Sequence, residues 1–152
     1  MKHIVEERPA HDAELMRLLD AAFAELVARY GAEGRSRVKD GARHFVVLDE
    51  AHRAVACGAV QVFEPGSDHP GDAEVKRMYV EPAARGRGFA RAMLARLEEV
   101  ARAGGHPVLR LSTGDLQPAA IALYESCGYV RTEAWGKYVD QPGIHCYAKV
   151  FG

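Results

Sequence analysis

The sequence lacks long hydrophobic runs, has few cysteines and carries almost no net charge, and each of these absences narrows what the chain can be. No apolar stretch approaches the roughly 18 residues of a membrane span. Charged residues begin at Lys2 and Glu6, too early for a secretory signal peptide. Cys57, Cys127 and Cys146 have no ligand-like spacing and cannot all pair. We therefore expect a reduced protein in the cytoplasm.

The near balance of charge gives no support for binding to nucleic acid. Twenty Lys and Arg stand against 21 Asp and Glu, which leaves a formal net charge of −1. Within residues 76–96, however, the only acid is Glu81, and the basic residues are Lys76, Arg77, Arg85, Arg87, Arg91 and Arg96. This local excess suits a small anionic ligand, although a solvated helix face with Glu–Arg pairs explains part of it. We expect neither a nucleic-acid nor a membrane partner.

The length and the hydrophobic pattern predict one domain over residues 1–152. Apolar residues recur at helical spacing over 11–30 and 87–103, and a shorter helix begins at Pro118 and ends at Gly128. Strand-like runs lie at 3–7, 44–48, 54–63, 73–80, 108–112, 129–132 and 144–151. A hairpin meander followed by a strand–helix–strand unit indicates an α/β (α+β) protein with a mixed sheet covered by helices.

The most informative segment joins the strand 73–80 to the helix 87–103. It reads Val80-Glu81-Pro82-Ala83-Ala84-Arg85-Gly86-Arg87-Gly88-Phe89-Ala90. A glycine-rich turn that opens a helix presents unpaired N–H groups and the positive end of the helix dipole, which suits phosphate. The segment lacks the Gly-Lys-Ser/Thr ending of a nucleotide P-loop and the Gly-x-Gly-x-x-Gly pattern of a dinucleotide fold. A tight strand-to-helix connection without a ligand is the alternative.

Two blocks of the chain resemble the GNAT superfamily of acyl-CoA-dependent N-acetyltransferases. Val80-x-Pro82-x-x-Arg85-Gly86-x-Gly88-x-Ala90 is similar to the family signature Arg/Gln-x-x-Gly-x-Gly/Ala. The second block is similar to the later helix-and-strand segment of the family and reads Gln117-Pro118-x-Ala120-Ile121-x-Leu123-Tyr124-Glu125-x-x-Gly128-Tyr129. The element order also agrees, so the resemblance covers nearly the whole chain. It implies a mostly antiparallel sheet of about six to seven strands. About four helices would flank this sheet, which would be splayed between the strands 73–80 and 108–112.

The resemblance implies an acetyl-CoA site at the glycine turn, without a metal. Backbone amides from Arg85 to Ala90 would wrap the pyrophosphate, and the strand before the turn would pair with the pantetheine arm. Gln117 stands where the family commonly has asparagine, so its amide would contact the coenzyme; simple helix entry explains it equally well. The predicted coenzyme-binding residues are Met78, Tyr79, Val80, Arg85, Gly86, Arg87, Gly88, Phe89, Ala90, Arg91 and Gln117.

Tyr124 and Glu74 are the candidate catalytic residues. The family pattern places a tyrosine at the position of Tyr124 against the coenzyme sulfur, as general acid; core packing is the alternative. Glu74 stands 11 residues before Arg85, the spacing at which some members carry a general base. An ordered water in that role, or an exposed glutamate paired with Lys76, are the alternatives. Ser112 and Thr113 are weaker candidates for contacts with pantetheine or acceptor.

Other polar and aromatic residues carry less information. His106, His145 and Cys146 have the wrong spacing for a metal site. Closing-strand packing explains Trp135, Tyr138 and Tyr147 as well as an acceptor pocket does. A solvated loop is the preferred interpretation of Arg29, Arg35, Arg37 and Lys39, ahead of recognition of a carboxylate-bearing amine.

The resemblance, with Tyr124 and Glu74 as candidate acid and base, implies an acyltransferase that moves an acetyl group from acetyl-CoA to a primary amine of a small molecule or peptide. The amine would attack directly in a ternary complex. A non-catalytic acyl-CoA-binding or regulatory module is the alternative. Dimerisation is common in the family, so the resemblance allows a homodimer.

Overall fold

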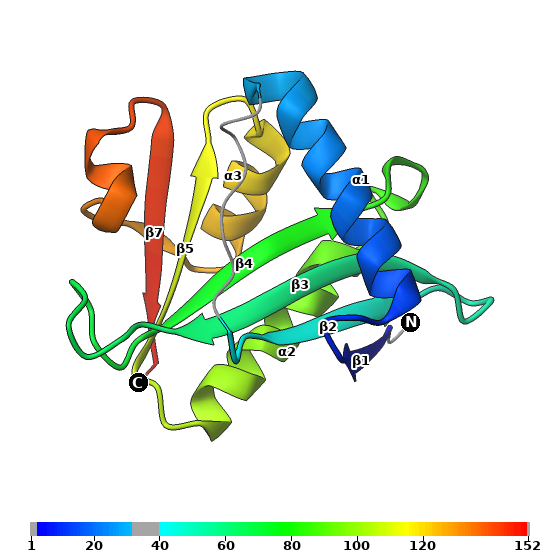
Figure 1. Ribbon diagram of the computed structural model, residues 1–152, viewed down its shortest axis with the longest axis horizontal. Coiled ribbons are helices and arrows are strands. Elements are labelled where there is room, and N and C mark those ends of the chain that lie inside the picture. Colours follow the sequence, from blue (N-terminus) through cyan, green and yellow to red (C-terminus); the bar gives the residue numbers. More distant parts are fainter. Residues whose placement is uncertain (1–2, 32–39, 152) are drawn as a thin grey trace. The chain divides into compact units, whose positions relative to one another are not determined.

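The computed structural model describes residues 3–31 and 40–151. Its seven strands form a sheet in the order β1-β2-β3-β4-β5-β7-β6 (Figure 1). The strands are β1 (Ile4–Arg8), β2 (Arg43–Leu48), β3 (Ala54–Val62), β4 (Ala73–Val80), β5 (Val108–Gly114), β6 (Val130–Arg131) and β7 (Ile144–Val150). The helices are α1 (Ala13–Tyr30), α2 (Phe89–Ala103) and α3 (Pro118–Ser126), with 3-10 turns η2 (Pro82–Ala84) and η3 (Gly136–Asp140).

The predicted mixed, mostly antiparallel sheet is confirmed. Antiparallel pairing joins β1 to β2, β2 to β3, β5 to β7 and β6 to β7. β4 and β5 pair in parallel at Ala73↔Leu109 and Glu74↔Arg110, the first two residues of β4. The resemblance implied about four helices, and the described ranges contain three α-helices.

The chain forms two compact units, each built from two separate segments. Unit 1 comprises Met1–Gln61 and Lys76–Leu97, and unit 2 comprises Val62–Val75 and Glu98–Gly152. The prediction of a single domain over 1–152 stays a prediction.

In unit 1, helices cover both faces of the β2–β3 hairpin (Figure 1). Asp12 caps the start of α1, and its carboxylate accepts from the Leu15 N–H at 3.0 Å. Leu15 and Leu18 of this helix pack in one buried cluster with Val46, Leu48, Ala54 and Cys57 of the hairpin. On the opposite face, a Cβ built on Gly58 would lie 2.8 Å from Cγ of Met93 in α2. Gly58 therefore lets α2 approach the sheet closely.

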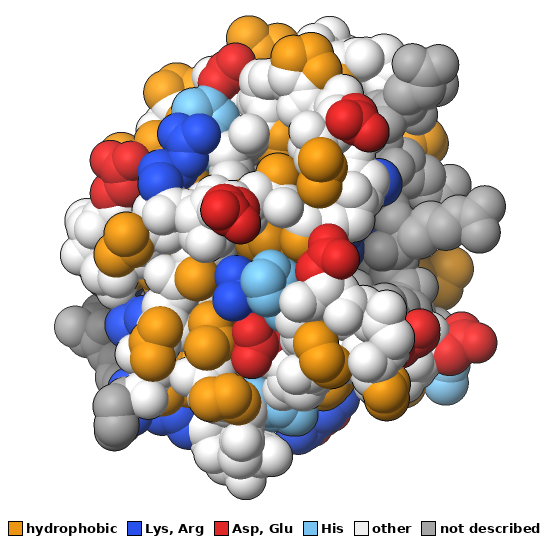
Figure 2. Space-filling model, turned by 90° about the vertical axis from the view of Figure 1, so that its left-hand side faces the viewer, with side chains coloured by type: hydrophobic (Ala, Val, Ile, Leu, Met, Phe, Trp, Pro, Cys, Tyr) orange, Lys and Arg blue, Asp and Glu red, His pale blue; other side chains and the backbone are white. Residues whose placement is uncertain are grey.

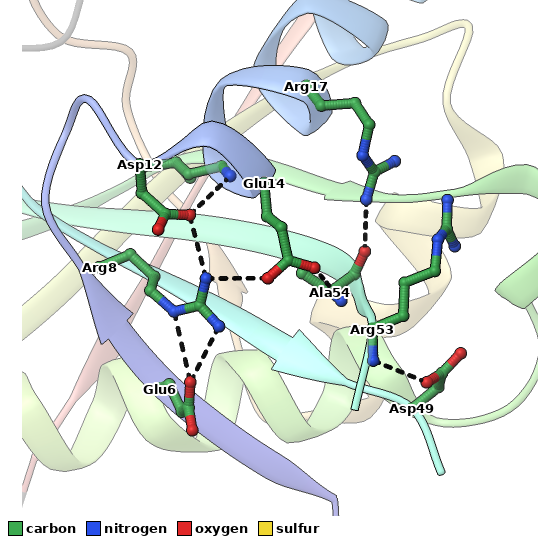
Figure 3. A network of polar contacts seen from close by, with 9 residues as sticks. Glu6, Arg8, Asp12, Glu14, Arg17, Asp49, Arg53 and Ala54 are labelled. Carbon is green, nitrogen blue, oxygen red and sulfur yellow. Dashed lines mark hydrogen bonds and ion pairs between the residues drawn. The ribbon is translucent and has the colours of Figure 1, made fainter. Parts of the chain in front are cut away.

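A polar network fixes the start of α1 against the start of β3 (Figure 3). Glu14 accepts from the Ala54 N–H at 2.9 Å, and Arg17 donates to the Ala54 carbonyl at 2.8 Å. Arg8 donates to the other Glu14 oxygen at 3.0 Å. The hydrogen bond from Ala54 and the contact with Arg8 lower the pKa of Glu14 below its usual value. The start of α1 is thus tied to β3 by hydrogen bonds to the Ala54 backbone as well as by apolar packing.

In unit 2, β5 and β7 carry two different clusters on their two faces. Neighbouring strand residues point to opposite faces, so Cys146 and Tyr147 of β7 mark the two sides. The Tyr147 ring lies 6.3 Å from that of Tyr124 in α3. Cys146 belongs to a buried cluster whose other members are Phe63, Trp135 and Tyr138.

The surface carries charge of both signs. On the face shown in Figure 2, acidic, basic and hydrophobic side chains are interspersed. No helix in the described ranges has the length and apolar character needed to cross a membrane.

Candidate functional site

The glycine turn between η2 and α2 gathers backbone N–H groups at a helix start. The Ala92 N–H donates to the Gly88 carbonyl at 3.0 Å, which makes Gly88 the N-cap residue of α2. The amides of Phe89 and Ala90 therefore belong to the first helical turn, which offers them no acceptor within the helix. These donors point along the positive end of the helix dipole. The geometry suits an anion such as phosphate.

Both glycines of the turn adopt a conformation that other residues rarely take. The φ angles are +79° at Gly86 and +86° at Gly88. A Cβ on Gly86 would meet no protein atom within 4 Å, so the backbone angle, and not crowding by the protein, explains this glycine. The Arg85 N–H already donates to the Pro82 carbonyl at 3.3 Å. The amides available for an anion, here called the amide cradle, therefore run from Gly86 to Ala90.

Glu81 anchors the residue that leads into the turn. Its N–H donates to the Val55 carbonyl at 2.9 Å, and its carboxylate accepts from Arg53 at 2.7 and 2.9 Å and also from Arg17. Burial raises the pKa of Glu81, but the hydrogen bonds from the two arginines outweigh it and hold the pKa below its usual value. The end of β4 is thereby held in place before the turn begins.

Two arginines of the turn are paired with acids from elsewhere in unit 1, and no local pattern in the sequence predicts these pairs. Arg85 donates to Glu25 of α1 at 2.7 Å. Arg87 donates to both oxygens of Glu50 in the β2–β3 turn, at 2.7 and 2.9 Å, and lowers the pKa of that carboxyl. Arg91 is exposed. The basic excess seen in the sequence is thus partly balanced in space.

The strand before the turn contains an interruption. Arg77 has a φ of +60°, a left-handed conformation that breaks the regular pleat of β4. Beyond it, Met78 lies on the α2 side of the sheet beside Gly58, while Tyr79 packs against the cluster under α1. Regular alternation along β4 would put Glu74 on the same face as Met78 and Val80, but that pattern does not carry across this interruption. A left-handed residue within a strand changes the direction of the backbone groups that follow it.

Tyr124 is both a core aromatic and a candidate acid. It is only 5% exposed, and its ring contacts those of Tyr129 and Tyr147. Burial, with a smaller effect of Cys127, raises its pKa to about 12. Tyr129 donates its hydroxyl to Glu98 and Tyr147 to Glu125, both at 2.9 Å. Among the described residues, the Tyr124 hydroxyl has no such acceptor.

Glu74 lies on the other face of unit 2. It is 4% exposed, so the alternative of an exposed glutamate is wrong. Its register with Arg110 places it on the Arg110 and Cys146 side of the strands, opposite Tyr147 and therefore opposite Tyr124. Arg110 donates to Asp72 at 2.9 Å on this side and lies over the Trp135 ring at 5.7 Å. The two candidate catalytic residues do not touch.

Gln117, Ser112 and Thr113 are also in unit 2. Gln117 is the N-cap residue of α3 but makes no capping hydrogen bond with its side chain. Thr113 is buried and Ser112 is half-buried. Within the described residues, no group of three or more His, Cys, Asp or Glu side chains could hold a metal. Arg35, Arg37 and Lys39 lie outside the described residues.

Comparison with known proteins agrees with this geometry. Residues 8–129 match the model of the acetyltransferase (GNAT) family. An IAA acetyltransferase from Azospirillum brasilense is 36% identical over 147 residues, which cover 91% of both chains. A putative acyl-CoA N-acyltransferase from Klebsiella pneumoniae has a TM-score of 0.81 at 29% identity, with 97% of each chain covered.

One further solved structure shares the fold and contains the coenzyme. The putative acetyltransferase yncA from Salmonella typhimurium, solved with acetyl-CoA, has a TM-score of 0.74 at 18% identity and covers 99% of this chain and 94% of its own. At that identity the likeness shows the fold alone. Because the family match spans most of the chain and includes the glycine turn, the chain belongs to the GNAT family of acetyl-CoA-dependent N-acetyltransferases.

Proposed function

We propose that this enzyme transfers the acetyl group of acetyl-CoA to a primary amine of a small molecule or peptide, by direct attack of the amine on the thioester. The amide cradle from Gly86 to Ala90 at the start of α2 carries this proposal. Its donors bind the pyrophosphate, and the strand end Met78–Val80 pairs its backbone groups with the pantetheine arm. Arg87, Arg91 and Gln117 add polar contacts to the coenzyme.

Acetyl transfer requires that one proton leave the amine and that the departing thiolate be stabilised. Glu74, or a water that it orders, accepts the amine proton. The amine approaches the thioester carbon from one side and the sulfur departs from another, so the acid and the base need not touch. The position of Glu74 and Tyr124 on opposite faces of unit 2 is compatible with these separate roles.

Tyr124 stabilises the thiolate chiefly as a hydrogen-bond donor. With a pKa near 12, its hydroxyl stays protonated throughout the neutral range. A thiol with a pKa near ~8.5 is the stronger acid, so complete proton transfer from this phenol to the thiolate is uphill. A neutral donor held in a buried site still lowers the energy of the developing negative charge.

The substitution Tyr124→Phe tests this role. We expect kcat to fall about tenfold to a hundredfold, the effect of losing one hydrogen bond to the developing thiolate in the transition state. The affinity for acetyl-CoA should change little, since the cradle is intact. The measurement is release of free thiol with a panel of amines, with mass spectrometry of the acetylated product, beside calorimetric titration of acetyl-CoA.

Tyr129→Phe is the matched control, because it removes a hydroxyl of the same aromatic cluster that is already bonded to Glu98. It should lower stability without a comparable loss of kcat. Wild-type turnover in Tyr124→Phe would remove Tyr124 from the mechanism. Tight binding of acetyl-CoA without turnover on any amine would instead indicate a non-catalytic module.

A further inference from the structure

Arg85 directs its side chain back toward the protein. Its Nε donates to the Val80 carbonyl at 2.9 Å, and its Nη2 donates to the Glu25 carboxylate at 2.7 Å. The guanidinium also lies 5.6 Å from the centre of the Tyr79 ring. One side chain therefore bonds the last residue of β4, stacks on the residue before it and reaches α1.

The acid partner of Arg85 is well placed to fix it. Glu25 also accepts from Arg29 one helical turn later, at 3.5 Å. The Glu25 side chain is 25% exposed, whereas the Glu50 partner of Arg87 is 56% exposed. Exposed ion pairs contribute little, and partial shielding from water strengthens them. The two arginines of the turn thus differ: the acid partner of Arg87 is the more exposed one, whereas Arg85 also bonds the carbonyl at the end of β4.

We propose that Arg85 is a positioning residue, and that Glu25 of α1 sets its orientation and so tunes the affinity for acetyl-CoA without touching the coenzyme. This inference rests on the proposed function of the turn. The planar guanidinium fixes the direction of the Val80 carbonyl, and with it the peptide groups on either side of Glu81. A site whose backbone is already in the binding conformation loses less entropy when the ligand binds.

An alternative role for Arg85 predicts the opposite change in affinity when Glu25 is neutralised. If Arg85 instead swings outward to contact a phosphate, Glu25 competes with that phosphate. Neutralising Glu25 would then release Arg85 and tighten binding. If Arg85 holds the strand end, neutralising Glu25 loosens the support and weakens binding. The sign of a single substitution therefore separates the two roles.

The experiment is calorimetric titration of CoA and acetyl-CoA into wild type, Glu25→Gln, Arg85→Gln and the double variant. We expect Glu25→Gln to raise Kd about threefold to tenfold, and the double variant to bind no worse than Arg85→Gln, because the residues act as one unit. In turnover assays the loss should appear in KM for acetyl-CoA and not in kcat. Arg85→Lys should bind acetyl-CoA no better than Arg85→Gln does, since an ammonium cannot hold two acceptors in one plane as a guanidinium does.

Glu7→Gln is the matched control. Glu7 forms two hydrogen bonds with Arg43, both at 2.8 Å, in the same unit and away from the turn. This variant should bind CoA as wild type does. Wild type that binds neither CoA nor acetyl-CoA would refute the proposed function itself. Wild type that binds, together with a Glu25→Gln variant that binds equally well or more tightly, would overturn the positioning role. Should Arg85→Gln fail to fold, Glu25→Gln still decides.

Discussion

At the scale of single residues, the backbone angle of Gly86 matters more than the space around it. A glycine in a phosphate-binding turn is commonly explained by the close approach of backbone to phosphate, which a Cβ would block. The structure adds that φ is +79° and that no protein atom lies within 4 Å of the place a Cβ would take. An alanine would therefore fit the free protein, but at the cost of conformational strain. Relief of that strain would rotate the amides of the cradle.

Gly86→Ala should cost about 1 to 2 kcal/mol of stability, the cost of a left-handed conformation, and raise the Kd for CoA about tenfold, the effect of losing one charge-assisted hydrogen bond. Gly41→Ala is the matched control, because Gly41 has a φ of +87° and also has nothing within 4 Å of a Cβ. Urea denaturation and calorimetry should show similar destabilisation in both variants and weaker CoA binding in Gly86→Ala alone. Equal Kd values would exclude the cradle as the phosphate site.

Single residues also show which features could be predicted from the sequence and which could not. The glycines, Tyr124 and Glu74 were found because a motif surrounds them, and their roles stay predictions. The pairing of Arg85 with Glu25 spans 60 positions, and no local pattern connects the two. The left-handed Arg77 was equally hidden, because arginine has no tendency toward that conformation. The features that could not be predicted, the Arg85–Glu25 pair and the conformation of Arg77, arise only when the chain folds.

At the scale of elements, the predicted order of helices and strands is confirmed, with ends displaced by a few residues. The spacing of apolar residues is sufficient to predict this order, because glycine, proline and polar capping residues mark the end of each helix or strand. The pairing order is different. β7 lies between β5 and β6. β5 therefore pairs with β7, as at Val108↔Val150, and not with β6, the next strand along the chain. Alternation of apolar residues reports a strand's faces and not its partners.

The contact between α2 and β3 yields a prediction at this scale. Gly58→Ala should destabilise the protein by about 1 to 3 kcal/mol, because the new methyl meets Met93 and Met78 in a filled core. In a Met93→Ala background the same change should cost less, since the cavity receives the methyl. Urea denaturation of the four proteins measures both effects. Equal costs in the two backgrounds would show that α2 does not rest on Gly58.

At the scale of the whole molecule, titratable groups limit stability at both ends of the pH range. Asp12 and Glu14 have lowered pKa values, first because backbone N–H groups bond to them. Their contribution is present above the unfolded pKa of about 4 and is lost as pH falls through the folded values. Tyr124 has a raised pKa, chiefly through burial, so its contribution is complete below pH 10 and is lost as pH rises toward 12. Burial raises the pKa of Tyr129 and Tyr147 in the same direction.

Burial also lowers the pKa of His44 and raises the pKa of Cys57 to about 12. The free energy of unfolding should therefore be highest between about pH 6.5 and 9 and fall on both sides. On the alkaline side, Tyr124 alone accounts for about 2 to 3 kcal/mol by pH 12, from its shift of about two units. Urea midpoints at pH 4, 7.5 and 11 measure the three regions. Tyr124→Phe should flatten the alkaline fall, and an unchanged slope in that variant would assign the fall to other groups.

The two units also have a consequence for synthesis on the ribosome. Each unit takes its residues from two stretches of chain, and β3 and β4 both pass from one unit to the other. No single cut of the chain releases either unit whole. A growing chain cannot complete unit 1 before Leu97 has emerged, and Glu74 must then wait for Arg110, its partner in the parallel pair. Non-local pairing of this kind slows folding, so one edge of β4 stays unpaired until β5 has emerged.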